Sequence, residues 1–231
     1  MKKWMKSANH AIEGIIYAVR TQRHMRWHLF VALVALILGL SLNISRVEFV
    51  LLCTAVMLVL VTEMLNTAIE KTIDMICREF HPHAKNAKDI AAGVVLIASI
   101  GSLMLAYLIL YPALKAAVHE GTWKMPKAPN DVVALVSLTV VIILVVIIKA
   151  LLGKGEPLRG GMPSGHAAVS FSIWTAALYL TDSITIIFLT LVLAVMVSWS
   201  RLSSGIHRPA EVIAGALLGA GVTLLFVRLF A

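Results

Sequence analysis

The sequence of 231 residues has little charge and very few cysteines. Asp, Glu, Lys and Arg together make up 14% of the chain, whereas hydrophobic residues make up 60%, well above the share in a soluble domain. The two cysteines, Cys53 and Cys77, have no CxxC spacing, which excludes a disulfide scaffold and indicates packing roles. A glycine-rich Walker loop is absent as well. Most of the chain is therefore expected to lie in lipid.

Stretches without a charged residue recur along the whole chain. Each is near the length that crosses about 30 Å of hydrocarbon as a helix. They occupy residues 29–45, 49–62, 90–114, 132–148, 160–181, 183–200 and 212–227. We predict an all-α integral membrane protein with about seven transmembrane helices.

The net charge of +8 does not predict a nucleic-acid partner, because the basic residues lie at the ends of apolar runs and not on one soluble face. The N-terminal segment has lysines but neither the apolar core nor the cleavage site of a signal peptide. Ile12, Ile15, Ile16 and Val19 recur there at helical spacing, which predicts an amphipathic helix at the membrane interface.

One segment, from Tyr111 to Asn130, combines prolines, a glycine and charges between two apolar runs. Carboxylates, Asn and Lys precede it, whereas histidines, Ser and Arg follow it. We predict a three-span domain at 1–114, a linker at 115–130 and a four-span domain at 131–231. Basic residues concentrate at the N-terminus and in alternate loops, the linker excepted. The positive-inside rule then places both polar clusters on the cytoplasmic face of a bacterial inner membrane.

The first polar cluster is a stripe of Glu63, Asn66, Glu70 and Asp74, spaced by three, four and four residues. On a helix this spacing keeps all four within about 80° of arc. Ionisable groups at such depth usually face a protein interior or a watery cavity. A solvated helix end is the alternative, but Glu63 follows fourteen uncharged residues. Acidic groups here would hold Mg²⁺ and nucleotide phosphates, while one carboxylate takes a proton from an alcohol.

The run Glu63-Met-Leu-Asn-Thr-Ala-Ile-Glu70, with Asp74 and Ala87-Lys-Asp89, resembles the prokaryotic diacylglycerol kinase and undecaprenol kinase family over about residues 8–112. The resemblance implies a membrane lipid alcohol as substrate, ATP and Mg²⁺, and a homo-oligomer, trimeric in known members. It implies Glu63 as general base and Glu70 on the metal. The nucleotide site would comprise Asn66, Glu70, Asp74, Glu79, His81, Lys88 and Asp89.

The stretch Arg23-His-Met-Arg-Trp-His28 is more similar to the undecaprenol branch of that family. Gln22 departs from the pattern, because a glutamate is expected there and an amide is a weaker Mg²⁺ ligand. This first half is therefore either a kinase or a scaffold. His81 and His83, in a polar loop without further ligands, are expected to face solvent.

The second polar cluster comprises Lys154–Arg159, Gly160–His166 and Ser200–His207, followed by Glu211. Ser164 is a good N-cap, and the backbone N–H groups that begin a helix, including that of Gly165, suit an anion. Lys154, Arg159 and Arg201 would surround a phosphate.

The histidines of this cluster have separable roles. His207 would attack phosphorus, Glu211 would orient its ring, and His166 would protonate the leaving oxygen. Any one of these residues alone is more often an interfacial anchor. Two histidines, two arginines, a lysine and a Ser-Gly turn together are not explained in that way.

Pro163-Ser-Gly-His166 and Ser200-Arg201 with His207 resemble the type 2 phosphatidic acid phosphatase superfamily over about residues 130–231. The resemblance implies a phosphohistidine on His207, His166 as the acid, and no metal. Glu211 replaces the usual aspartate, and the Lys/Arg element is compressed, so Lys149 rivals Lys154. Four spans instead of six mean that the first half would supply packing.

These observations together predict a bifunctional enzyme. The N-terminal half would phosphorylate undecaprenol or diacylglycerol, and the C-terminal half would dephosphorylate a lipid phosphate or pyrophosphate. The alternatives are a phosphatase with a kinase-like scaffold and a non-enzymatic lipid-binding or transport protein.

Overall fold

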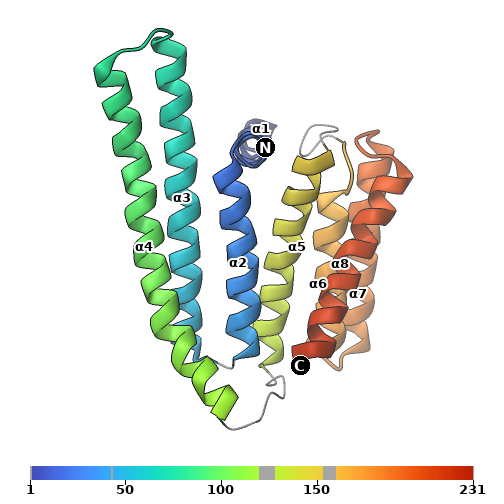
Figure 1. Ribbon diagram of the computed structural model, residues 1–231. Coiled ribbons are helices and arrows are strands. Elements are labelled where there is room, and N and C mark those ends of the chain that lie inside the picture. The colour runs from blue at the N-terminus through green and yellow to red at the C-terminus, as the bar shows by residue number, and fades with distance from the viewer. Residues whose placement is uncertain (1, 43, 120–127, 153–159, 231) are drawn as a thin grey trace. The chain divides into compact units, whose positions relative to one another are not determined.

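The structure is a computed structural model that describes residues 2–42, 44–119, 128–152 and 160–230. Over these ranges the chain forms α helices and no strand, which confirms the predicted fold class. The helices are α1 (Lys2–Thr21), α2 (Arg23–Ser41), α3 (Arg46–Ile76), α4 (Pro82–His119), α5 (Asn130–Leu152), α6 (Gly165–Leu180), α7 (Ile184–Ser203) and α8 (Pro209–Phe230), coloured from blue to red in Figure 1.

Among the described residues, six helices are long and apolar enough to cross a membrane, namely α2, α3, α4, α5, α7 and α8. The predicted seventh span, residues 160–181, is the exception, because its first residues form a loop and α6 has only 16 residues. At 1.5 Å per residue, α6 is about 24 Å long, so residues on either side of it are needed to cover about 30 Å of hydrocarbon. Large apolar side chains are exposed along the spans, for example Ile97 and Leu103 on α4. These surfaces suit a lipid environment.

The chain divides into two compact units, which are described separately. One unit comprises residues 21–126 and contains α2, α3 and α4. Helix α3 begins with a capping box, in which Ser45 Oγ accepts from the Glu48 N–H and Glu48 Oε2 accepts from the Ser45 N–H at 2.7 Å. Ala35, Leu52 and Ile109 form a small apolar core between the helices. Helix α4 continues to His119, so residues 115–119 of the predicted linker are helical.

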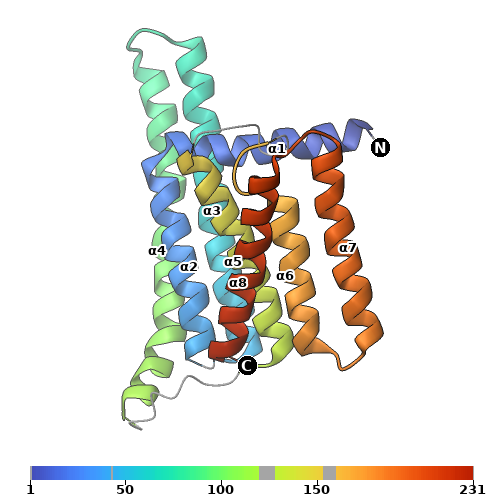
Figure 2. The same cartoon turned by 90° about the vertical axis from the view of Figure 1, so that its right-hand side faces the viewer.

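The other unit comprises residues 1–20 and 127–231, and therefore contains α1 together with α5 to α8. Helix α1 confirms the predicted N-terminal helix, and it runs crosswise to the bundle of α5–α8 (Figure 2). The domain boundaries predicted from sequence stay a prediction, and the place of α1 in this unit is an additional finding.

Helices α6 and α8 pack closely because two glycines of α8 face the backbone at the start of α6. A Cβ added to Gly219 would lie 1.9 Å from the carbonyl oxygen of Ala168, and one added to Gly215 would lie 2.3 Å from that of Ser164. Small residues allow such close approach between membrane helices. A buried hydrogen bond of 2.7 Å between the hydroxyl groups of Ser172 and Thr223 joins the same pair. This packing brings the start of α6 next to the start of α8.

Candidate active sites

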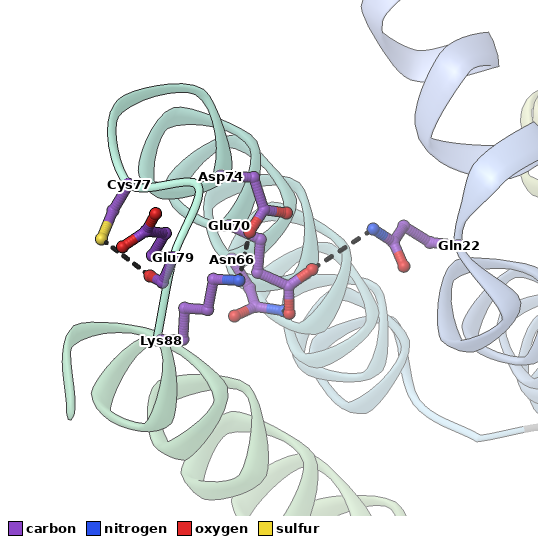
Figure 3. Close-up of polar contacts among 7 residues, drawn as sticks. All are labelled: Gln22, Asn66, Glu70, Asp74, Cys77, Glu79 and Lys88. Carbon is purple, nitrogen blue, oxygen red and sulfur yellow. Dashed lines mark hydrogen bonds and ion pairs between the residues drawn. The ribbon is translucent and has the colours of Figure 1, made fainter. Parts of the chain in front are cut away.

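The predicted acidic stripe lies on α3 in the unit of residues 21–126, and Figure 3 shows its outer part. Glu70 accepts two hydrogen bonds from amides: Asn66 Nδ2 donates to its Oε1 at 3.1 Å, and Gln22 Nε2 donates to its Oε2 at 3.4 Å. The spacing of four residues therefore joins Asn66 and Glu70, as predicted. Gln22, which is neutral, therefore bonds directly to the carboxylate that the family resemblance implies as the Mg²⁺ ligand.

The oxygen atoms around Glu70 suit a hard cation. Asn66 Oδ1 is buried and has no hydrogen-bond partner in the described part of the chain, and carbonyl and carboxylate oxygens are the ligands that Mg²⁺ prefers. No group of three or more His, Cys, Asp or Glu side chains in the described ranges is arranged to hold a metal. Glu70 and the unpaired Asn66 Oδ1 would offer such a cation one carboxylate and one carbonyl ligand.

The other predicted nucleotide-binding residues lie where α3 ends and α4 begins. Lys88 on α4 forms an ion pair with Asp74 on α3 (Figure 3). The carbonyl of Glu79 accepts from Cys77 Sγ in the connecting turn. His81 and Asp89 are exposed, and no hydrogen bond within the described ranges joins them to the stripe. The structure thus brings Asn66, Glu70, Asp74 and Lys88 together, and Glu79 lies beside them (Figure 3). His81 and Asp89 lie apart from this group.

Glu63, the predicted general base, lies deeper on α3 and is only 3% exposed. His28 lines a cavity of about 260 Å³ between α2, α3 and α4, together with apolar residues that include Val59, one helical turn before Glu63. Glu63 itself does not line this cavity, but it lies one helical turn from Val59, which does.

The second polar cluster lies at one end of the α5–α8 bundle. His207, in the loop before α8, contacts Glu211 in the first turn of α8 through Nδ1 and Oε2 at 2.7 Å. The same carboxylate oxygen accepts from the Arg208 N–H at 3.2 Å. When His207 Nδ1 donates to Glu211, the lone pair of the ring lies on Nε2. The His207 side chain is 1% exposed, and burial lowers its pKa below the ordinary value of 6.5, opposed by the Glu211 hydrogen bond.

Three buried polar atoms of this cluster lack a hydrogen-bond partner in the described part of the chain. They are Ser164 Oγ, Arg201 Nε and His207 Nε2. Buried polar groups are normally paired, so these three atoms are candidates for binding a polar ligand. A hydroxyl and a guanidinium donate, while a neutral imidazole nitrogen has a lone pair. These atoms together suit a phosphate ester.

The predicted cap on α6 is right in position but wrong in its hydrogen bond. Ser164 is the N-cap residue, but its side chain makes no capping bond. Instead, its backbone N–H donates to the carbonyl of Glu211 at 2.9 Å. This bond ties the start of α6, with Gly165 and His166, to the backbone of the residue whose carboxylate contacts His207, and it leaves the Ser164 hydroxyl available.

Lys149 belongs to this cluster. It is buried near the end of α5, and Nζ donates to the Gly160 carbonyl at 3.2 Å. Its charge acts on both His166 and His207. Gly160 has φ +99°, and a Cβ there would lie 3.2 Å from the Ile206 carbonyl oxygen, so the loop needs glycine. Lys154 and Arg159 lie outside the described residues.

The fold and the two clusters define a multi-pass membrane protein with a carboxylate site in one unit and a histidine site in the other. Residues 9–110 match the prokaryotic diacylglycerol kinase family, and residues 151–231 match the PAP2 superfamily. The chain therefore belongs to the prokaryotic diacylglycerol kinase family and carries a PAP2 superfamily domain after it.

Several relatives share the first half. The chain is 37% identical to the undecaprenol kinase of Bacillus subtilis over 114 residues, which are 49% of this chain and 93% of that protein. It is 35% identical to the diacylglycerol kinase of Synechocystis over 47% of this chain and 62% of that protein. It is 32% identical to the diacylglycerol kinase of Escherichia coli, over 46% of this chain and 88% of that protein. No solved structure matches.

Proposed function

We propose that the chain is a bifunctional enzyme of lipid phosphates in a bacterial inner membrane. The PAP2 domain hydrolyses a lipid phosphate or pyrophosphate through a phosphohistidine, and the kinase-family domain phosphorylates a lipid alcohol, undecaprenol or diacylglycerol. The family matches and the site geometry support this proposal. The single observation that carries it is the unpaired, buried Nε2 of His207, whose other ring nitrogen is held by Glu211.

The phosphatase reaction has two steps. In the first, His207 Nε2 forms a bond to phosphorus, the ester bond to the lipid breaks, and His166 gives a proton to the leaving oxygen. Ser164 Oγ, Arg201 and Lys149 bind the phosphoryl oxygens, and Glu211 stabilises the ring as it becomes positive. In the second step, His166 takes a proton from water, the water oxygen bonds to phosphorus, and the bond to Nε2 breaks. Phosphate leaves and both histidines return to their starting forms.

The test is phosphate release from a long-chain lipid phosphate by the purified protein in detergent micelles. His207→Ala removes the nucleophile and is expected to abolish release. His24→Ala, an exposed histidine in the other unit, is the matched control and is expected to keep wild-type activity. Release is also expected to persist with EDTA, because no step assigned to these residues needs a metal. Unchanged release by His207→Ala would show that this mechanism is wrong.

For the kinase half, Glu63 takes the proton of the lipid hydroxyl as that oxygen bonds to the γ-phosphorus of ATP and ADP leaves. Its burial, one helical turn from the Val59 wall of the cavity at His28, supports this role. We assign Lys88 and Asn66 to the nucleotide phosphates, and the bonds that hold them at Asp74 and Glu70 support this assignment. Bound Mg²⁺, held by Glu70 and Asn66, would neutralise charge on those phosphates.

The kinase test uses purified protein, Mg-ATP and either undecaprenol or diacylglycerol. Glu63→Gln is expected to abolish transfer of phosphate, whereas Asp182→Asn, an exposed residue of the other unit, is expected to have no effect on it. If the wild-type protein phosphorylates neither alcohol, the kinase-family half is a scaffold. The bond from Gln22 to Glu70 is the observation that favours this second candidate. Cross-linking in micelles then tests whether the trimer of the family also forms here.

We also propose that both polar clusters face the cytoplasm, because the positive-inside rule places the basic loops there. Met162, 40% exposed beside the histidine site, and Asp182, exposed in the loop between α6 and α7, lie at opposite ends of α6. In a background without Cys53 and Cys77, Met162→Cys is expected to react with an impermeant maleimide only in inverted vesicles, and Asp182→Cys only in intact cells. The reverse pattern would place the histidine site outside.

A further inference from the structure

A cavity of about 480 Å³ opens from the histidine site into the apolar part of its unit. Its size is that of a ligand pocket. Three sides come from α5, α6 and α7, with Val145, Val169 and Leu193 among the lining residues. Two titratable groups, Lys149 and His166, lie where α5 ends and α6 begins, whereas the hydroxyl groups of Ser170 and Thr190 in the lining donate to backbone carbonyls of their own helices. The cavity therefore has a cationic end at the proposed phosphate site and an apolar remainder.

The fourth side of this cavity is α1. Ile12, Ile15 and Ile16 line it, and Ile16 is only 4% exposed. These isoleucines belong to the face of α1 whose spacing predicted an interfacial helix. The helix is held to the end of α5 by Arg20, whose Nη2 donates to the carbonyl of Lys149 at 3.0 Å. In Figure 2, α1 crosses the end of the bundle at which Lys149 and His166 lie.

The sequence comparison assigns most of α1 to the kinase family, whereas in the structure α1 belongs to the unit that contains the histidine site. The match to the kinase family begins at residue 9, whereas the PAP2 match begins at residue 151. The apolar face of a kinase-family helix thus lines a cavity that leads to the phosphatase site. An interfacial role alone would leave this face to the lipid bilayer, and it would not explain why Ile16 is buried.

We propose that α1 is part of the lipid-binding site of the phosphatase domain, where Ile12, Ile15 and Ile16 contact the hydrocarbon nearest the phosphate of a long-chain lipid phosphate. This inference rests on the proposed phosphatase function. The occupant is amphipathic, as the cavity is: its anionic end faces Lys149 and His166, and its chain faces the apolar walls. The helix would then select lipid esters over soluble ones by adding apolar contacts that a soluble ester lacks.

The experiment compares kcat/KM for long-chain phosphatidic acid with kcat/KM for p-nitrophenyl phosphate, a soluble ester. Ile15→Asn makes the wall polar, and because Ile15 is 41% exposed, the helix is expected to tolerate the change. The ratio of the two constants is expected to fall about tenfold, the effect of losing contact with roughly two methylene groups. Most of this change should appear in the KM for the lipid. Ala11→Asn, exposed and outside the cavity lining, is the matched control and should keep the wild-type ratio.

A second measurement does not depend on catalysis. Phosphatidic acid with a diazirine near the start of its acyl chain is expected to label residues 12–16 after irradiation. Excess unlabelled phosphatidic acid should suppress this labelling, and the same excess of phosphatidylcholine should not. An unchanged ratio in Ile15→Asn, or labelling that phosphatidylcholine suppresses equally, would overturn the role of α1 while the phosphatase stands. A wild-type protein that hydrolyses neither ester would refute the proposed function itself, and this inference with it.

Discussion

Replacing Glu211 by glutamine tests how much of the phosphatase chemistry depends on the charge beside His207. In the structure, one carboxylate oxygen accepts from both His207 Nδ1 at 2.7 Å and the Arg208 N–H at 3.2 Å. The carbonyl oxygen of a glutamine has two lone pairs and can accept both bonds. The substitution therefore keeps the ring orientation and the lone pair on Nε2, and it removes only the negative charge.

The expected loss follows from the strength of the bond. A hydrogen bond to a charged group contributes about 1.5–3 kcal/mol, and a neutral one about 0.5–1.5 kcal/mol. The difference is roughly 1.4 kcal/mol, which is about tenfold in rate. Glu211→Ala removes the bond altogether and leaves the ring free to turn, so its loss should reach about a hundredfold.

The assay is kcat/KM for phosphate release from a long-chain lipid phosphate, measured for Glu211→Gln, Glu211→Ala and His207→Ala side by side. We expect the activities to decrease in that order. Wild-type activity in Glu211→Gln would mean that the carboxylate charge does not stabilise the ring. An activity as low as that of His207→Ala would mean that Glu211 does more than orient and polarise, and both results would refute the reasoning.

Three further predictions use other parts of the chain. Burial lowers the pKa of His207, so its neutral form persists below pH 6.5. The acidic limb of the phosphatase pH–rate profile is therefore expected below that pH, and a limb above it would contradict the assignment of His207 as the nucleophile. Gly219→Ala places a methyl group against the Ala168 carbonyl and should lower the free energy of unfolding by about 1–3 kcal/mol. Gly221→Ala, whose added methyl group meets open space, should leave it unchanged. Equal melting temperatures of the two variants in detergent would contradict this prediction. Gln22→Glu adds a second carboxylate to the proposed metal site and should lower the Mg²⁺ concentration needed for kinase activity several-fold; an unchanged Mg²⁺ titration would contradict it.

The helical fold could be predicted because uncharged runs of membrane-spanning length leave the backbone few alternatives in lipid. The error at residues 160–181 has a physical reason. Gly160 and Gly161 have φ of +99° and +83°, which is outside the α-helical region, but glycine adds no charge to mark the loop. A count of uncharged residues therefore joined the loop to α6.

The site could be predicted only where its partners are near in sequence. The spacing of four between His207 and Glu211 indicated their contact, and the same spacing joined Asn66 to Glu70. The bond from the Ser164 N–H to the Glu211 carbonyl depends on the packing of α6 against α8, which no local pattern encodes. Sequence also left Lys149 and Lys154 as rivals, because both follow the same apolar run, and the burial of Lys149 supports it as the phosphate-binding residue.

Arg20 and Gln22 are two residues apart in sequence, but they belong to different units. Arg20, at the end of α1, bonds to the backbone of Lys149 in the histidine-site unit, whereas Gln22, the N-cap of α2, bonds to Glu70 in the carboxylate-site unit. Two peptide steps thus separate a residue held by one unit from a residue held by the other. Because each of these bonds lies within one unit, a change at Arg20 should appear in the phosphatase assay and a change at Gln22 in the kinase assay. Changes at His207 or Glu63 should appear in one assay each, because each of these side chains lies within a single unit.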